Sequence, residues 1–242
     1  MGHPDQQDSG DDMRIVIQKD GPYVVRGGAP LVRKEQVVSE HGEPLTWRRG
    51  ETIDAPETYV LCRCGKTATP PFCDQTHACV EFDGAETADP RPTVERQIVL
   101  RDGAGIQVSR DYSICAESGF CANRFTTVEK LAPYTGDTQV RAQVIGMIER
   151  CPSGSYTYRV DAGEGDIEPD LPRQIAVTVE ITSQGPIPGP LWVTGRIPIR
   201  RSDGKPMETR NRVTLCRCGH SGNKPLCDGT HRALQSAGRK PE

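Results

Sequence analysis

Two sets of three cysteines and one histidine are the residues of this chain whose types and spacing could do chemistry. Their members are Cys62, Cys64, Cys73 and His77 in the first set, and Cys216, Cys218, Cys227 and His231 in the second. Both sets share one spacing: Cys-x-Cys, eight residues, Cys, three residues, His. Thiolates and imidazoles bind soft metals, so each set predicts an iron–sulfur cluster or a structural Zn²⁺ site. The narrow Cys-x-Cys pair favours the cluster, because zinc sites tend to use pairs two to four residues apart.

Short-range geometry explains how each set could converge. Cys62 and Cys64 lie two apart, so on an extended segment both sulfurs point to the same side. Cys73 and His77 lie four apart, which would place both on one face of a helical turn. We therefore expect a strand to present the first two ligands and a short helix the last two.

Three further residue types recur in both sets. Gly65 and Gly219 follow the Cys-x-Cys pair and let the backbone turn. Asp74 and Asp228 follow the third cysteine, where a carboxylate can accept hydrogen bonds from backbone N–H groups and fix the loop around the ligands. The arginine inside each Cys-x-Cys either balances the charge of a cluster or is an ordinary solvated strand residue.

The elements around the sets are duplicated. Residues 21–31 and 189–199 agree at five of eleven positions, and residues 61–77 and 215–231 agree at ten of seventeen. The difference in residue number between the copies is 168 for the first pair of segments and 154 for the second. The first copy therefore carries a 14-residue insertion around 40–52. Each copy, at about 60 residues, is too short to build a generous core alone. We expect the two copies to pack about a pseudo-twofold axis as an internal dimer.

The second set and its neighbours resemble the CDGSH iron–sulfur (NEET) family, whose pattern is C-x-C-x2-[ST]-x3-P-x-C-D-G-[STA]-H. All fixed positions match, at Cys216, Cys218, Ser221, Pro225, Cys227, Asp228, Gly229, Thr230 and His231. The first set departs once, where Gln75 replaces the glycine. If that glycine adopts a conformation costly for other residues, the first site should be strained. The resemblance implies a redox-active, releasable [2Fe–2S] cluster at each set, in a tandem, monomeric member of the family.

The segment between the copies, about 93–183, has a different pattern. Apolar residues alternate over 175–181 as in a half-buried strand, and recur every four positions over 140–151 as on one face of a helix. Glycine and proline over 185–190 predict a linker.

Three cysteines of this middle segment form a further candidate site. Cys115, Cys121 and the pair Cys151-Pro152 resemble a pared-down bacterial ferredoxin, and three ligands of this kind imply a [3Fe–4S] cluster. The alternative is a domain that has lost its cluster and kept the thiols as small buried hydrophobes. We expect a β-rich α+β fold with a first CDGSH module over 13–85, a ferredoxin-like domain over 93–183 and a second module over 187–236.

Composition excludes several classes of function. The net charge of −3 provides no positive field for nucleic acid, and no apolar run is long enough to span a bilayer. The polar opening residues lack a secretion signal or transit peptide, which predicts a cytoplasmic, prokaryotic location. No catalytic triad, carboxylate pair or phosphate-binding loop is present, so we do not expect an enzyme.

The chemistry of the candidate clusters leaves three hypotheses. The first is single-electron transfer between partner proteins. The second is a cluster donor, or a redox or pH sensor, that delivers [2Fe–2S] to apo-proteins. Because histidine titrates near neutral pH, we expect acid below about pH 6 to loosen both clusters. The third is a zinc-bound structural protein.

Overall fold

A computed structural model describes residues 13–102, 105–160 and 163–236 and contains three β-sheets with few helices. The stretch 1–12, on which the expected absence of a leader rests, lies outside the described residues. The first sheet has four strands in the order β11-β1-β2-β5. They are β1 (Arg14–Ile17), β2 (Tyr23–Arg26), β5 (Tyr59–Leu61) and β11 (Ile199–Arg200).

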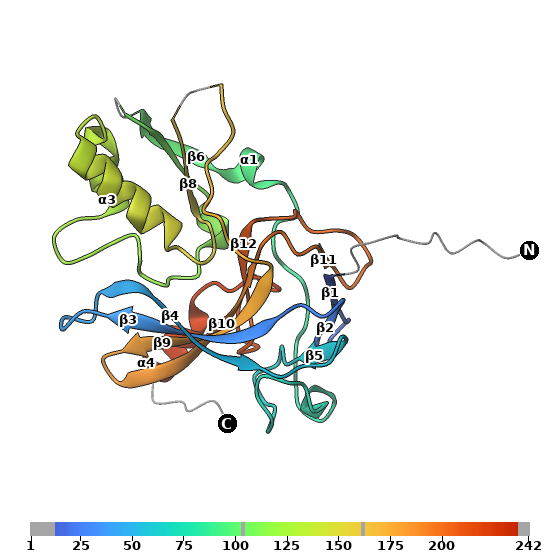
Figure 1. Cartoon of the computed structure of the whole chain (residues 1–242). Helices are drawn as coiled ribbons and strands as arrows, with labels where there is room; N and C mark the ends of the chain where they lie inside the picture. Colours follow the sequence, from blue (N-terminus) through green and yellow to red (C-terminus); the bar gives the residue numbers. More distant parts are fainter. Residues whose placement is uncertain (1–12, 103–104, 161–162, 237–242) are drawn as a thin grey trace, which may run out of the picture.

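The second sheet has five strands in the order β12-β10-β9-β3-β4. They are β3 (Leu31–Val38), β4 (Pro44–Ile53), β9 (Gln174–Thr182), β10 (Gly185–Thr194) and β12 (Arg212–Leu215). Strands from opposite ends of the chain, blue and orange in Figure 1, therefore lie side by side in one sheet. Most of the stretch identified as an insertion becomes β4, which pairs with β3 in a hairpin at the edge of this sheet.

The two copies exchange strands reciprocally. In the first sheet, β1 pairs antiparallel with β2 of its own copy and parallel with β11 of the other, at Ile15 and Ile199. In the second sheet, β9 pairs antiparallel with β10 and parallel with β3 of the first copy, at Ile175 and Leu31. The ferredoxin-like domain predicted over 93–183 included β9, but this pairing places β9 with the second copy, because the strand completes the five-stranded sheet. The first sheet thus contains one strand from the second copy, β11, and the second sheet contains two strands from the first copy, β3 and its hairpin partner β4. Buried side chains from both copies, including these three isoleucines and Leu31, form one shared core.

The linker predicted over 185–190 was wrong, because these residues form the first part of β10, paired with β9. Proline has no N–H group to donate, but β12 pairs only with the later residues of β10, from Leu191 on, so the proline-rich part has a neighbour on one edge alone. The strand predicted over 175–181 is present as β9, but it is not half-buried. Residues 174–178 are all buried, since β9 lies inside the five-stranded sheet.

The middle segment contains the third sheet, of order β6-β7-β8, and the longest helix, α3 (Thr138–Glu149). Its other elements are α1 (Thr93–Arg96), β6 (Ile98–Asp102), β7 (Gln107–Arg110), η2 (Tyr112–Ile114), α2 (Val128–Leu131), η3 (Ala132–Tyr134) and β8 (Tyr156–Arg159). The predicted helix is confirmed: its buried residues Val144 and Ile148 pack with the sheet in a separate core, and Asp137 caps its first turn. Figure 1 shows this α/β unit above the five-stranded sheet.

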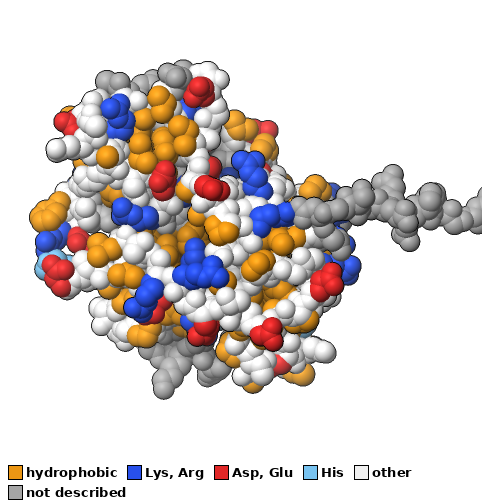
Figure 2. Space-filling model, in the orientation of Figure 1, with side chains coloured by type: hydrophobic (Ala, Val, Ile, Leu, Met, Phe, Trp, Pro, Cys, Tyr) orange, Lys and Arg blue, Asp and Glu red, His pale blue; other side chains and the backbone are white. Residues whose placement is uncertain are grey.

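The middle segment also has the most apolar exterior. Seven of the eight large, exposed hydrophobic side chains among the described residues lie between 94 and 160. Figure 2 shows hydrophobic side chains gathered on the part of this face that lies over the middle segment. No helix in the described ranges combines the length and the apolar composition that a bilayer-spanning segment needs.

Candidate metal centres

The two Cys3His loops have the same backbone framework. The N–H of Cys62 donates to the carbonyl of Pro71 at 2.9 Å, and the N–H of Cys216 donates to the carbonyl of Pro225 at 2.8 Å. In each loop, the third cysteine donates its N–H to the residue two positions before the first cysteine. The strand end that carries Cys-x-Cys and the return segment that carries the third cysteine are therefore held side by side, as an extension of β5 or β12.

The donor atoms of each site lie in two close pairs. In the first site, the sulfurs of Cys62 and Cys64 are 3.6 Å apart, and the sulfur of Cys73 is 3.4 Å from Nδ1 of His77. The second site repeats these separations at 3.7 and 3.4 Å. Two close pairs of donors suit a core of two metal atoms, with Nδ1 as the ring nitrogen on the cysteine side.

The last two donors do not share a helix face, contrary to the prediction. A 3₁₀ turn, η1 (Thr76–Ala78), carries His77, and a longer helix, α4 (Thr230–Ser236), carries His231. Both begin three residues after the cysteine. The residue just before each helix has left-handed backbone, with φ of 71° at Gln75 and 86° at Gly229. This turn, rather than helical spacing, brings histidine and cysteine together.

The expected strain at Gln75 follows from that left-handed backbone. For a residue with a Cβ atom this conformation costs about 1–2 kcal/mol, whereas glycine adopts it freely. We predict that Gln75→Gly raises the free energy of unfolding by about 0.5–1 kcal/mol, after allowing for the greater unfolded-state entropy of glycine. Urea denaturation of the metal-free protein measures this. Gln184→Gly is the matched control, since Gln184 is equally exposed but has no left-handed backbone, and it should destabilise. Equal losses in both variants would contradict the assignment of strain.

The two aspartates at equivalent positions of the loops accept the backbone hydrogen bonds expected of them. Asp74 accepts from the N–H groups of Ala68 and Thr76 at 2.8 and 3.0 Å, and Asp228 accepts from those of Gly222 and Thr230 at the same distances. The bonds from Thr76 and Ala68 hold the pKa of Asp74 well below its usual range. Burial opposes ionisation of Asp228, but its hydrogen bonds still hold its pKa below the ordinary value. Each loop is thus tied around an ionised carboxylate.

Burial and the neighbouring thiols shift the pKa values of the ligand cysteines. Burial raises the pKa of Cys64 to about 11. The hydrogen bond between Cys216 and Cys218 lowers the pKa of Cys216 to about 6 and raises that of its partner. Metals bind the thiolate, so loading either site must displace protons from the remaining thiols.

The arginines within the Cys-x-Cys pairs are held by backbone carbonyls, and for Arg63, which is buried, the solvated alternative was wrong. Arg63 is 1% exposed and donates from Nε to the carbonyl of Gly21 at 2.8 Å. Arg217 makes the equivalent bond to Gly189, also at 2.8 Å, and burial lowers its pKa to about 10, which leaves it charged at neutral pH. Arg63 ties its cysteine loop to the turn before β2, and Arg217 ties its loop to the middle of β10.

The two loops touch back to back, which the sequence did not reveal. Gly65 and Gly219 have left-handed backbone, as expected of glycines at a turn, but each also faces the other site. A Cβ atom on Gly65 would lie 2.5 Å from the carbonyl oxygen of Cys218, and one on Gly219 would overlap the carbonyl of Cys64. In addition, the hydroxyl of Tyr23 donates to the carbonyl of Cys216 at 2.7 Å. The two candidate sites therefore form one packed unit.

The sites differ in their surroundings. Cys227 and His231 of the second site are buried, whereas Cys73 and His77 of the first are partly exposed. Nε2 of His231 lies 3.1 Å from a carboxylate oxygen of Glu180, a fully buried residue of β9. Sequence reasoning missed Glu180; its only signal was an acid within an otherwise apolar strand.

The structure places Cys115 and Cys151 close enough to Cys121 for their thiols to act on it electrostatically, but among the described residues no three Cys, His, Asp or Glu side chains converge as a metal-binding group. Burial, together with the neighbouring thiols of Cys151 and Cys115, raises the pKa of Cys121 to about 11. The guanidinium of Arg110 lies 3.9 Å from the sulfur of Cys115. Partly buried thiols beside an arginine suit a negatively charged metal–sulfur centre, and metal-free thiols in the same surroundings would have the same raised pKa.

The middle cysteines are fastened to the second module. Arg212, at the start of β12 and fully buried, donates to the carbonyls of Ile148, Glu149 and Cys151 at 2.8–2.9 Å. A Cβ atom on Gly229 would lie 2.7 Å from that of Glu117, in the loop between Cys115 and Cys121. The middle segment therefore packs directly on the loop of the second candidate site.

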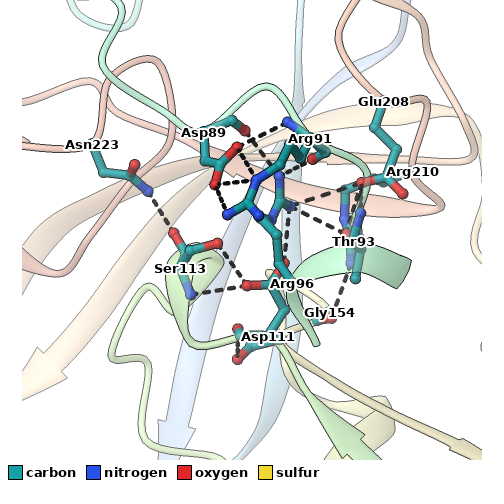
Figure 3. Close-up of polar contacts among 11 residues, drawn as sticks. Asp89, Arg91, Thr93, Arg96, Asp111, Ser113, Gly154, Glu208, Arg210 and Asn223 are labelled. Atoms are coloured by element: carbon teal, nitrogen blue, oxygen red, sulfur yellow. Dashed lines mark hydrogen bonds and ion pairs between the residues drawn. The ribbon is translucent and has the colours of Figure 1, made fainter. Parts of the chain in front are cut away.

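A polar network also joins the middle segment to the second module (Figure 3). Arg96 forms an ion pair with Asp111 of the middle segment at 2.9 Å, and both side chains are at least 92% buried. Glu208 of the second module accepts from the N–H and the hydroxyl of Thr93 at 3.0 and 2.7 Å. Asn223, within the second Cys3His loop, donates to the carbonyl of Ser113 at 2.6 Å.

Comparison with protein-family models agrees with this division of the chain. Residues 20–78 and 188–232 both match the iron-binding zinc finger of CDGSH type. Residues 101–161 match a divergent 4Fe-4S mono-cluster family. No match was found among curated proteins or among solved structures.

Proposed function

Because the chain is a tandem CDGSH iron–sulfur protein with a divergent mono-cluster segment between its modules, we propose that it carries single electrons between partner proteins, with one [2Fe–2S] cluster in each module. The observation that carries this proposal is the contact between the two cysteine loops at Gly65 and Gly219. Electron carriers need their centres held close together in fixed positions, and these two loops are packed against each other.

The donor sets fit the proposed clusters. Cys62 and Cys64 would hold one iron and Cys73 and His77 the other, and the second module repeats this arrangement. A bound cluster of this kind supplies reversible one-electron storage, at a higher potential than an all-cysteine cluster because imidazole replaces a negative thiolate. The protein contributes fixed loops: the aspartate in each loop anchors its backbone, and Arg63 and Arg217 hold the loops to neighbouring backbone carbonyls.

We also propose that the two modules form an internal pseudo-dimer in a monomeric chain. The reciprocal exchange of β11 and β3 supports it, as does the equivalence of the bonds made by Arg63 and Arg217. A homodimer of single-motif chains would supply the same contacts twice by symmetry.

For the middle segment, we propose that Cys115, Cys121 and Cys151 hold a third cluster. Three ligands suit [3Fe–4S], and the family match over 101–161 supports an iron–sulfur site there. An empty site with buried thiols is the alternative. A third centre packed on the second module favours electron transfer over cluster donation, because relays place several centres within one protein.

Anaerobic purification followed by counting of iron and sulfide tests the proposal. About four irons per chain would indicate two [2Fe–2S] clusters, and about seven would add [3Fe–4S]. Through repeated reduction and reoxidation the visible spectrum should be restored without loss of iron. Cys73→Ser and Cys227→Ser should each remove one cluster, whereas Cys79→Ser, at an exposed thiol outside the three sets, should remove none. A colourless, zinc-containing protein would contradict the proposal, and transfer of iron to an apo-acceptor on oxidation would favour the donor function.

A further inference from the structure

Glu180 is a fully buried carboxylate, and its burial is energetically costly. It lies on β9 with none of its surface exposed, and Oε1 has no hydrogen-bond partner among the described residues. Oε2 contacts Nε2 of His231 and the guanidinium of Arg232. An isolated buried carboxylate costs several kcal/mol, so it persists where its partners compensate or where it serves a site.

We infer that Glu180 is a positioning residue for His231, and that it makes the second CDGSH site hold its cluster more tightly than the first. This inference rests on the proposed function, in which each site binds a cluster. In the proposed arrangement the carboxylate of Glu180 accepts a hydrogen bond that Nε2 of His231 donates. Nδ1, on the side of Cys227, is then left with a free lone pair. The same contact holds the ring in the orientation that a metal ligand needs, and it makes the imidazole a stronger donor.

The first site lacks this arrangement, although its copy contains an acid at the equivalent position. Ile15 of β1 and Ile175 of β9 are equivalent, because each pairs with corresponding strands of the two copies. Five residues further along each chain segment, Asp20 is therefore the counterpart of Glu180. However, β1 ends at Ile17, and Asp20 lies exposed in the following turn with φ of 47°. Among the described residues, no carboxylate is hydrogen-bonded to His77.

The difference arises from strand length. The strand β9 continues to Thr182 and carries Glu180 beneath α4, where His231 and Arg232 reach it. The strand β1 ends at Ile17, two residues after its pairing with the other copy begins at Ile15, so its acid lies in the turn beyond the strand. The two sites therefore have the same set of ligands, but only the second has a carboxylate in contact with its histidine among the described residues.

Release of iron to an excess of a ferrous or ferric chelator at fixed pH tests the inference on the full, cluster-loaded chain. Loss of the absorbance that belongs to the two [2Fe–2S] clusters should occur in two phases of equal amplitude, the fast one from the first site. Removing a carboxylate that supports a metal-bound histidine weakens metal binding about 10- to 100-fold, so Glu180→Ala should accelerate the slow phase by that factor. Glu180→Gln, which keeps an acceptor oxygen but loses the charge, should have a smaller effect. Asp20→Asn is the matched control and should change neither phase.

A second measurement separates positioning from a loss of fold. The reduction potential of the second cluster should rise in Glu180→Gln while urea denaturation of the cluster-free variant remains close to that of the parent protein. A single release phase in the parent protein, or a slow phase and a potential unaffected by both Glu180 variants, would overturn the inference. An initial iron content well below about four per chain would instead contradict the proposed function, and the inference with it.

Discussion

Gly219→Ala is expected to destabilise both cluster sites, although it replaces no ligand. The new alanine would have to keep the left-handed backbone of Gly219, at a cost of about 1–2 kcal/mol. Its Cβ atom would also overlap the backbone carbonyl of Cys64 in the other module. Backbone cannot move aside as a flexible side chain does, and overpacking adds about 1–3 kcal/mol. We expect a loss of about 2–5 kcal/mol in the free energy of unfolding and reduced iron content at both sites.

Gly204→Ala is the control for this experiment. Gly204 has the same φ of 82°, but a Cβ atom there would meet nothing within 4 Å. Gly204→Ala should therefore cost only the free energy of the left-handed backbone, about 1–2 kcal/mol, and leave the iron content unchanged. Urea denaturation and iron analysis of the two variants measure the difference. If both variants lose the same stability and keep their iron, the two loops do not depend on their mutual contact.

Arg212→Met should separate the middle segment from the second module. The substitution removes a buried guanidinium that serves three carbonyl groups and lies 2.8 Å from a carboxylate oxygen of Glu168. Removing one partner from such a set leaves the others buried and unpaired, which costs about 3–5 kcal/mol. Methionine preserves most of the side-chain volume of Arg212, so the loss in the free energy of unfolding measures the polar contacts. Hydrogen exchange should then show lost protection over the last turn of α3.

Arg200→Met is the comparison variant, because Arg200 is exposed on the short strand β11. We expect it to change the free energy of unfolding by no more than about 0.5 kcal/mol and to leave exchange in α3 unaltered. Protection of α3 that is the same in both variants would mean that Arg212 does not hold the segment.

Local features of the sites could be predicted from sequence because they depend on residues close together in the chain. Asp74 and Asp228 bind N–H groups within six residues of themselves, and the left-handed turn at Gln75 follows from its place in the motif. The duplication and the helix α3 were also readable, from self-similarity and from periodicity.

Features that depend on distant segments could not be predicted. The proline-rich part of β10 has the composition of a linker, and only its pairing with β9 makes it a strand. Likewise, Glu180 lies 51 residues from His231, and Arg212 lies 61 from Cys151. Such contacts have no spacing signature, because side chains far apart in sequence meet only once the strands have been exchanged.

The exchange of β3 and β11 has a consequence for how the protein responds to dilution. If the two copies were separate chains, each sheet would be completed by a second molecule, and its completion would depend on protein concentration. Here both partners belong to one chain, so the covalent connection sets an effective concentration that does not change when the protein becomes scarce. A proteolytic cut in the connection would restore the concentration dependence without removing a single contact. The middle segment is thus also the tether that keeps the two metal sites together at low abundance.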